Sequence, residues 1–299
     1  MLKMIEGNPR WSRVEPVTKG FSADKKYHVW DQSGGEYLLR ISHDKLFRQK
    51  WEQFALLRQL ARQDIPASRP VEFGRIDEEH IYLLLSWIRG VDAETHIACA
   101  DSEVAYELGL RGGEILRKIH AVEIKTSEEP WDVRYQKMVD QRIKDFKNCP
   151  LDLPQKDVYL SYVEKNRGVV HNRPTVLMHG DYHRGNMVVM PEGGLGIIDF
   201  DKVKTGDPYR DFKCFAWNVQ VSPYFASGII DGYFNHQIAS DFFPIMTLYA
   251  AEGMMRFVNW AIPYGKGEIK IALQQYQDML VWFDGFRRTV PAWYVGDGL

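Results

Sequence analysis

Two polar clusters interrupt the apolar stretches between Val176 and Phe212, and their residue types suit metal-assisted phosphoryl transfer. The first cluster reads HGDYHRGN and places Asp181 five residues before Asn186. The second reads DFD and begins at Asp199. Carboxylate and carboxamide oxygens are hard ligands of the kind that magnesium takes, together with water and phosphate oxygens. If Asp199 supplies the anionic ligand, Asp181 is free to accept a proton from an attacking hydroxyl.

The apolar runs around these clusters predict short buried strands joined by tight loops. They cover Val176 to Met178, Met187 to Met190, and Leu195 to Ile198. The polar side chains are therefore expected at strand ends. For any single Asp, capping a turn or pairing with an arginine is the competing interpretation.

HGDYHRGN followed by IIDFD resembles the catalytic loop and metal-binding motif of the aminoglycoside phosphotransferase family, whose members are relatives of the protein kinases. The resemblance implies that Asp181 is the catalytic base. It also implies that Asn186 is a magnesium ligand and that Asp199 binds the metal bridging the phosphates. The third position of the second motif is Asp201, where kinases carry glycine, and this argues against a kinase-style flip of an activation segment.

The resemblance assigns further roles around the loop. His183 stands where protein kinases carry a phosphate-contacting lysine, which implies a contact to the transferred group; a hydrogen bond that only braces the loop is an equally good interpretation. His179 is expected to orient the loop. Asp207 and Asp211, in GDPYRD, extend the match and are expected to be mainly structural. His120, which ends LRKIH, is expected to be a buried hydrogen-bonding residue.

The implied fold is α+β and bilobal, like that of the protein kinases. Residues 1–87 would form a small N-lobe with an antiparallel sheet and one helix, and residues 88–299 a larger, mainly helical C-lobe. Hydrophobic patterning agrees with the small lobe. The strand candidates are Val14 to Thr18, Lys26 to Trp30, Glu36 to Ser42, Val71 to Ile76 and Ile81 to Trp87, with a helix from about Leu46 to Gln63.

The small lobe is expected to hold the nucleotide phosphates. Backbone N–H groups of the loop KGFSADKKY and the Ser22 hydroxyl could cradle them, although an ordinary polar hairpin competes. Arg40 stands where kinases usually place a phosphate-binding lysine. Glu52 is the candidate partner of Arg40, and a surface pair between Glu52 and Arg48 is the alternative.

Adenine is expected to bind backbone groups near Leu85 to Trp87, so that ATP and GTP are not distinguished. Trp87 either stacks on the base or, as we favour, fills the core. The acceptor is expected to bind in the C-lobe, which is rich in aromatic residues from Thr205 onward. Glu252, within LYAAEGMM, is the candidate acceptor contact, although acidic and basic residues nearly balance in this region and do not indicate an acidic pocket.

Composition agrees with a soluble two-lobed enzyme. The chain has 299 residues, of which 45% are hydrophobic and 26% charged, and its net charge of -2 favours neither nucleic acid nor an anionic membrane as partner. Without a long apolar segment or a signal-peptide core, we expect a cytoplasmic protein. Cys99, Cys149 and Cys214 form no CxxC pair, so neither zinc binding nor a disulfide framework is indicated.

The leading interpretation is a kinase that uses ATP or GTP with Mg²⁺ to phosphorylate a hydroxyl of a small molecule, with an aminoglycoside as the named candidate. A metabolite acceptor such as choline, homoserine or a methylthio-sugar is the alternative. A non-catalytic nucleotide-binding module is the third interpretation, which the intact Asp181, Asn186 and Asp199 disfavour. The oligomeric state is not indicated.

Overall fold

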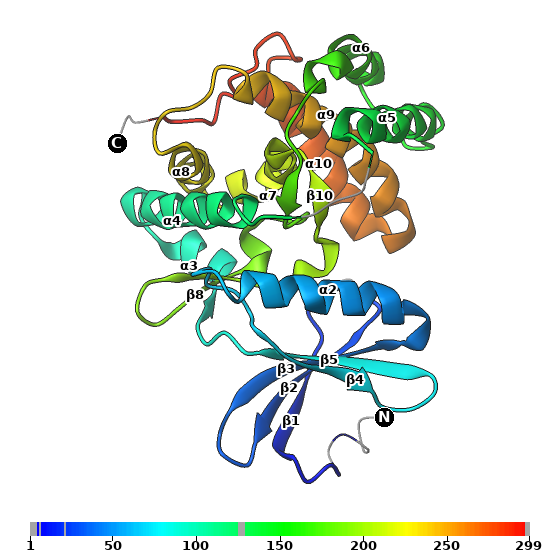
Figure 1. The fold of residues 1–299 in the computed structure, drawn as a ribbon. Coiled ribbons are helices and arrows are strands. Elements are labelled where there is room, and N and C mark those ends of the chain that lie inside the picture. Colours follow the sequence, from blue (N-terminus) through cyan, green and yellow to red (C-terminus); the bar gives the residue numbers. More distant parts are fainter. Residues whose placement is uncertain (1–4, 6, 21, 125–128, 297–299) are drawn as a thin grey trace. The chain divides into compact units, whose positions relative to one another are not determined.

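The structure is a computed structural model that describes residues 5, 7–20, 22–124 and 129–296 (Figure 1). It divides into two compact units, formed by the described residues of Met1–Val91 with Met187–Asp201 and by those of Asp92–Asn186 with Lys202–Leu299. The division into lobes at residues 1–87 and 88–299 stays a prediction. The units differ from it chiefly in assigning 187–201 to the first unit.

The first unit is built on a five-stranded antiparallel sheet in the order β1-β2-β3-β5-β4. Alternate strand residues point to one face, and Val29, Ile41 and Leu84 form part of the core beneath it. The five predicted strands are confirmed, and their ends agree within one residue, except that the first strand begins three residues earlier than predicted. They are β1 (Trp11–Val17), β2 (Lys25–Asp31), β3 (Glu36–His43), β4 (Pro70–Arg75) and β5 (His80–Ser86).

Helix α2 (Phe47–Leu60) follows β3 through the 3₁₀ turn η1 (Asp44–Leu46) and lies across one face of the sheet (Figure 1). It buries Phe54, Leu57 and Leu60, which recur every three residues on one face, as in an amphipathic helix. The same face also buries Lys50 and Gln53. A lysine is rarely buried without a partner, so its surroundings are important for the site.

Strands β8 (Met187–Val189) and β9 (Leu195–Ile197) form a hairpin, with β6 (Val91–Asp92) beside β8. Backbone hydrogen bonds attach this hairpin to the first unit, because Ile197 N–H donates to the Pro66 carbonyl and Ser68 N–H donates to the Ile197 carbonyl. The turn η4 (Phe200–Lys202) comes next. The hairpin therefore delivers Asp199 to the first unit.

The second unit is mainly helical, as predicted. One short antiparallel pair, β7 (Val176–Met178) with β10 (Lys204–Gly206), carries the catalytic loop at its end. The helices are α3 (Ala93–Cys99), α4 (Ser102–His120), α5 (Trp131–Lys147), α6 (Lys156–Asn166), α7 (Phe215–Val219), α8 (Pro223–Phe234), α9 (Phe242–Ala261) and α10 (Lys266–Trp282). The 3₁₀ turns are η2 (Arg167–Val170), η3 (Arg184–Asn186), η5 (Pro208–Cys214) and η6 (Ile262–Tyr264).

Helices α4 and α8 approach so closely that their contact consists of backbone. A Cβ at Gly113 of α4 would lie 2.2 Å from the Ile229 carbonyl oxygen, and one at Gly232 of α8 would lie 2.1 Å from the Leu110 carbonyl oxygen. Helix α4 also supports the catalytic loop, because the Gly112 carbonyl accepts a hydrogen bond from the Tyr182 hydroxyl at 2.6 Å. The glycines thus set the position of the scaffold under the loop.

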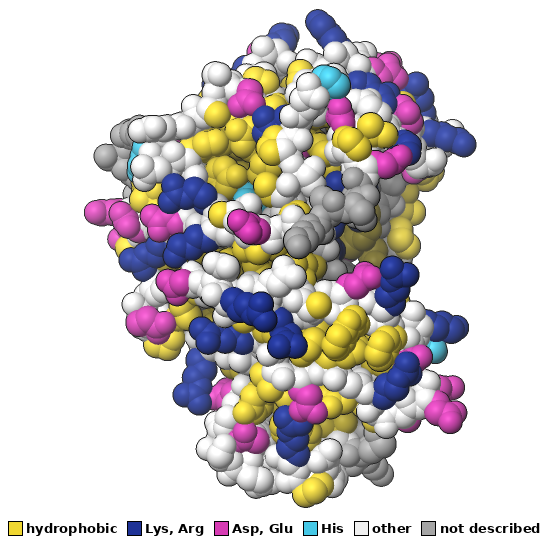
Figure 2. Space-filling view, viewed as in Figure 1, with side chains coloured by type: hydrophobic (Ala, Val, Ile, Leu, Met, Phe, Trp, Pro, Cys, Tyr) yellow, Lys and Arg dark blue, Asp and Glu magenta, His cyan; other side chains and the backbone are white. Residues whose placement is uncertain are grey.

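The visible surface has basic and acidic side chains interspersed with hydrophobic ones (Figure 2). Within the described part of the chain, no helix is long and apolar enough to cross a membrane. Cys99, Cys149 and Cys214 are free thiols.

We expect Gly113→Ala to lower the free energy of unfolding by about 2 kcal/mol, because the added methyl group forces two backbones apart. Gly253→Ala in α9 is the matched control, since its Cβ would lie an ordinary 3.8 Å from Lys213 Cβ. That change should stabilise the helix by up to about 1 kcal/mol. Urea unfolding of both variants measures the difference, and equal stabilities would contradict the packing argument.

Candidate active site

The catalytic-loop candidates lie together directly after β7. The Asn186 amide donates to the Asp181 carbonyl oxygen at 2.9 Å, and His183 Nε2 lies 3.6 Å from Asp181 Oδ2. Lys202 Nζ lies 2.8 Å from the same carboxylate oxygen. Gly180 permits this turn, because its φ is 84° and a Cβ there would lie 2.1 Å from the Lys202 carbonyl oxygen. The second unit therefore brings Asp181, His183 and Asn186 into one loop.

The surroundings of Asp181 keep it ionised. Burial raises the pKa of its carboxyl group, but the hydrogen bond from His183 and the charge of Lys202 outweigh burial and hold the pKa well below its ordinary value. Such a carboxylate accepts a hydrogen bond from a hydroxyl at neutral pH, yet is a weak base. A carboxylate of this kind can orient a hydroxyl and can take its proton late, as a new bond forms.

The two loop histidines brace the backbone. His183 Nδ1 accepts a hydrogen bond from Gly185 N–H at 3.1 Å, so the bracing interaction is present, while a contact to a phosphoryl group stays a prediction. His179 is fully buried, and its Nδ1 accepts a hydrogen bond from Asp181 N–H at 3.3 Å. The orienting role predicted for His179 is confirmed.

Asp211 fixes the beginning of the loop. Its carboxylate accepts hydrogen bonds from the N–H groups of His179 and Gly180 at 2.8 and 2.7 Å, and His120 Nε2 lies 3.1 Å away. Burial raises the pKa of Asp211, but the hydrogen bond and charge of His120 outweigh burial and bring the pKa down to about 2. The predicted structural role of Asp211 and the buried hydrogen-bonding role of His120 are both confirmed. Asp207 caps η5 by accepting from Tyr209 N–H at 2.9 Å, which is structural as well.

Arg40 is the centre of an ionic cluster in the first unit. Its Nη2 lies 2.9 Å from Asp24 Oδ2, and its Nη1 lies 3.1 Å from Asp199 Oδ1. Nη2 also pairs with Asp201 and lies 3.3 Å from Ser22 Oγ. Only 2% of the Arg40 side chain is exposed, so the guanidinium is enclosed by its own partners.

The predicted partner of Arg40 on α2 is wrong. Glu52 points outward and pairs with Arg48 at 3.0 Å, the surface alternative. Helix α2 instead presents Lys50, whose Nζ lies 2.7 Å from Asp24 Oδ2 and 3.3 Å from Asp201 Oδ1. The helical repeat explains the difference, because Glu52 lies off the buried face that carries Lys50.

Lys50, Gln53 and Asp24 were not singled out from the sequence. The signal for Lys50 and Gln53 was their spacing from the apolar face of α2, and Gln53 donates to Asp201 Oδ1 at 2.7 Å. Asp24 offered no such signal, because its partners lie far along the chain. Burial raises the pKa of Asp24, but Lys50, Arg40 and Ser42 together lower it below its ordinary value. All these groups therefore act as one charged network.

The donor set of the metal candidates fits a hard divalent cation. The cluster contains the carboxylates of Asp24, Asp199 and Asp201 against the cations of Arg40 and Lys50, and Lys26 lies close enough to interact with the same carboxylates. Asp199 has a left-handed φ of 63°, uncommon outside glycine, and 38% of its side chain is exposed.

In the second unit, the donating amide of Asn186 leaves its oxygen for a ligand. Among the described residues, no three His, Cys, Asp or Glu side chains form a ready-made metal cage. Magnesium does not need one, since it takes one or two carboxylates and fills its shell with water and phosphate oxygens. Asn186 and Asp199 therefore remain suitable metal ligands.

The other nucleotide candidates occupy the first unit. The Ser22 hydroxyl is exposed and accepts a hydrogen bond from Asp24 N–H at 3.2 Å. Leu85 is buried within β5, opposite Leu38. Trp87 is only partly buried and its ring stacks on His28 at 3.6 Å, so it does not fill the core as favoured. Trp87 N–H donates to the Glu36 carbonyl at 3.0 Å, and adenine contacts along this stretch stay a prediction.

Glu252 is not available to an acceptor. It is fully buried in α9, where its Oε2 accepts a hydrogen bond from Arg210 Nη1 at 2.7 Å and its other oxygen pairs with Arg142. A carboxylate inside a helical core must be neutralised, and two arginines do so here. We correct the prediction of an acceptor contact to a structural role.

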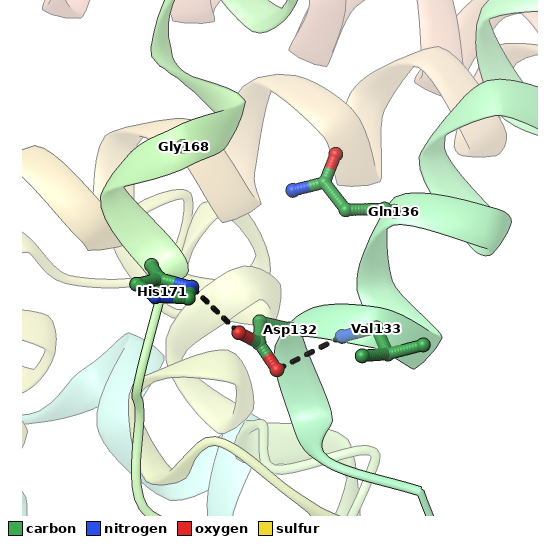
Figure 3. A pocket seen from close by; sticks show the side chains of 5 residues that line it. All are labelled: Asp132, Val133, Gln136, Gly168 and His171. Carbon is green, nitrogen blue, oxygen red and sulfur yellow. Dashed lines mark hydrogen bonds and ion pairs between the residues drawn. The ribbon is translucent and has the colours of Figure 1, made fainter.

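A hollow of 440 Å³ lies elsewhere in the second unit, between the start of α5 and η2 (Figure 3). Its lining consists of Asp132, Val133, Gln136, Gly168 and His171. The Asp132 carboxylate points toward the exposed His171 ring, 2.7 Å away. No catalytic-loop residue lines this hollow, so it does not mark the active site.

The fold and these polar groups define a small-molecule kinase with a protein-kinase-like fold. A model described as the phosphotransferase enzyme family (APH) matches residues 13–242 of the chain. The chain belongs to this family. Nucleotide and divalent-metal binding and a small-molecule acceptor are what the family's chemistry requires.

Known relatives agree. The chain is similar to an aminoglycoside 3'-phosphotransferase of Niallia circulans, with 26% identity over 209 residues that cover 65% of this chain and 74% of the relative. Among solved structures it resembles a thermostable mutant of aminoglycoside phosphotransferase APH(4)-Ia in a ternary complex with ADP and hygromycin B. The TM-score is 0.68 at 13% identity, covering 93% of this chain and 96% of the other.

It also resembles the amicoumacin kinase hAmiN in complex with AMP-PNP, Ca²⁺ and Ami. The TM-score is 0.68 at 13% identity, covering 97% of this chain and 95% of the other. At such identities the solved structures establish the protein-kinase-like fold alone.

We predict that Lys50 and Asp24 stabilise the first unit as a pair. Lys50→Met should cost about 3 kcal/mol of unfolding free energy, because it removes one partner of a buried ion pair. In the double variant with Asp24→Asn, part of that cost should be recovered, giving a coupling of about 1–3 kcal/mol. Arg48→Met, an exposed cation on the same helix, is the control and should change stability by less than about 0.5 kcal/mol. If the losses of unfolding free energy in the two single variants simply added up in the double variant, the predicted interaction between Lys50 and Asp24 would be refuted.

Asp211→Asn should lower the unfolding free energy at neutral pH by about 3 kcal/mol, because His120 and two N–H groups lose a buried carboxylate. The lowered pKa of Asp211 means that its carboxylate stabilises the native protein above pH 4 and that this contribution fades toward pH 2. The stability gap between wild type and variant should therefore narrow as the pH falls through that window. A gap that widens on acidification would argue against the assignment.

Proposed function

We propose that the protein is an ATP-dependent kinase that transfers the γ-phosphoryl group to a hydroxyl of a small molecule. The observation that carries the proposal is the ionised carboxylate of Asp181 in the HGDYHRGN loop, which His183, Asn186 and Lys202 contact. Family membership supports phosphoryl transfer as the reaction. We further propose a cytoplasmic location, where the nucleotide is available, and the N-lobe and C-lobe division at residue 87.

The reaction is an in-line displacement. The acceptor hydroxyl donates a hydrogen bond to Asp181, and its oxygen attacks the γ-phosphorus. As the new P–O bond forms, the bond to the β-phosphate oxygen breaks, ADP leaves, and the hydroxyl proton passes to Asp181. The low pKa of Asp181 suits a reaction in which the proton is transferred late. His183 is proposed to donate a hydrogen bond to the phosphoryl group.

Asn186 and Asp199 are the residues proposed to hold magnesium. When bound, the metal neutralises charge on the phosphate oxygens. Arg40 is proposed to contact the α- and β-phosphates, and Ser22 to support the loop above them. Each Arg40 nitrogen already donates a hydrogen bond to a carboxylate. A phosphate oxygen can therefore bind Arg40 only by replacing one of those carboxylates. Adenine is proposed to lie near Leu85 and Trp87.

Two classes of acceptor are compatible with this reaction, namely an antibiotic and a metabolite. The similarity to an aminoglycoside 3'-phosphotransferase favours an antibiotic acceptor, and with it a role in resistance. A metabolite acceptor keeps the same chemistry, and GTP in place of ATP is compatible with both. Glu252, the acidic contact predicted for a polycationic acceptor, is buried and therefore gives the antibiotic acceptor no support.

We expect Asp181→Asn to reduce the rate of phosphoryl transfer at least about a hundredfold while leaving nucleotide affinity nearly unchanged. A coupled ADP-release assay over aminoglycosides, macrolides, choline and sugar alcohols measures turnover, and calorimetric titration with Mg²⁺ and a non-hydrolysable ATP analogue measures binding. Turnover that survives the substitution would refute the role of Asp181. Nucleotide binding by a wild-type protein that turns over no acceptor would instead favour a non-catalytic module.

A further inference from the structure

A row of aromatic rings extends from the catalytic loop along the end of α9. The His183 ring lies 6.2 Å from Trp217, and Trp217 lies 5.5 Å from Phe257. Phe257 stacks on Trp260 at 5.5 Å with 19° between planes, and Trp260 lies 4.4 Å from Tyr264. The row thus connects α7, α9 and η6 to the loop that carries the catalytic base.

The four rings of this row belong to Trp217, Phe257, Trp260 and Tyr264, and they are more exposed than most aromatic side chains of the second unit. Trp217, Phe257 and Trp260 are half-buried, and Tyr264 is 46% exposed. By contrast, a second set in the same unit is fully buried, namely Phe225, Phe242, Tyr249 and Tyr276. Contiguous, partly exposed apolar rings beside a polar loop are a characteristic of ligand sites. Their faces suit a flat ring.

Basic side chains flank the row. Arg256 is exposed on α9, one turn before Trp260. Lys213 Nζ donates to the Gly180 carbonyl at 2.6 Å, directly before Asp181. Helix α9 lies against Lys213, because a Cβ at Gly253 would be 3.8 Å from Lys213 Cβ. Lys213 therefore lies beside the base, and Arg256 follows on α9 three residues after Gly253, the helix position next to Lys213.

The carboxylates of this neighbourhood are already engaged. Glu252 is held by Arg142 and Arg210, and Asp211 caps the catalytic loop. Within the residues that the structure describes, no carboxylate forms an ion pair with Lys204, Lys213 or Arg256. The approach to Asp181 therefore carries an excess of positive charge.

We propose that the acceptor is a flat, ring-containing alcohol that carries a carboxylate. In this arrangement, which rests on the proposed function, the ring stacks on Trp260 and Phe257, the carboxylate pairs with Arg256 and Lys213, and the hydroxyl reaches Asp181. The reaction is the displacement described above, and its product is a phosphate ester of that alcohol with ADP. A polycationic aminoglycoside would meet repulsion from the same cations.

The test compares three probes with the full-length protein loaded with a non-hydrolysable ATP analogue. They are 4-(hydroxymethyl)benzoate, its amine counterpart 4-(hydroxymethyl)benzylamine, and the aminoglycoside kanamycin. Calorimetric binding should rank the benzoate at least about tenfold tighter than the benzylamine, because one charge-assisted hydrogen bond accounts for a difference of that size. Tighter binding of the amine or of kanamycin, or no binding of the benzoate at millimolar concentration, would overturn the proposal.

Variants locate the effect. Arg256→Gln should weaken benzoate binding about tenfold and leave benzylamine binding unchanged or improved, whereas Trp260→Ala should weaken both probes. Lys270→Gln, an exposed cation on α10, is the matched control and should change neither. Melting temperatures verify folding. Equal losses with Arg256→Gln and Lys270→Gln would overturn the proposal, while nucleotide binding and the Asp181→Asn comparison report separately on the proposed function.

Discussion

The position of Asp181 depends first on Asp211, whose carboxylate accepts hydrogen bonds from the N–H groups of His179 and Gly180. They fix where the chain leaves β7, and hence where Asp181 can lie. Gly180 makes the turn possible, and Tyr182 anchors it to α4 through the Gly112 carbonyl. A buried carboxylate with several donors is a rigid support, and a catalytic base must be held to within a fraction of an ångström.

In the first unit, the charged residues that link the third strand to the following helix differ from those of a protein kinase. A protein kinase links its third strand to the following helix with a strand lysine and a helix glutamate. Here the strand carries Arg40 and the helix carries the cation Lys50, so Asp24 and Asp201 must lie between them. This places the loop that contains Asp24 and the segment that contains Asp199 within one network. In the function that we propose, the network would couple phosphate binding by Arg40 to metal binding by Asp199.

The strands of the first unit and the loop that carries Asp181 could be predicted from the sequence, because hydrophobic alternation and motif spacing agree with each other. The alternation of β2 and β3 and the tight spacing of HGDYHRGN specify strands and a loop without reference to distant residues. Glu52 was misassigned although a local signal was available, because the helical repeat places it off the buried face and beside Arg48. Glu252 was misassigned because its two arginine partners, Arg142 and Arg210, lie far from it in sequence.

The central claim is that Asp181 directs phosphoryl transfer to an alcohol. Phosphorus NMR of the protein with ATP, Mg²⁺ and the tightest-binding ring alcohol tests it directly, because it distinguishes a phosphate ester from inorganic phosphate. The account predicts a phosphomonoester resonance that grows together with ADP and is absent with Asp181→Asn. Inorganic phosphate as the only product, or ester formation that persists in the variant, would contradict it.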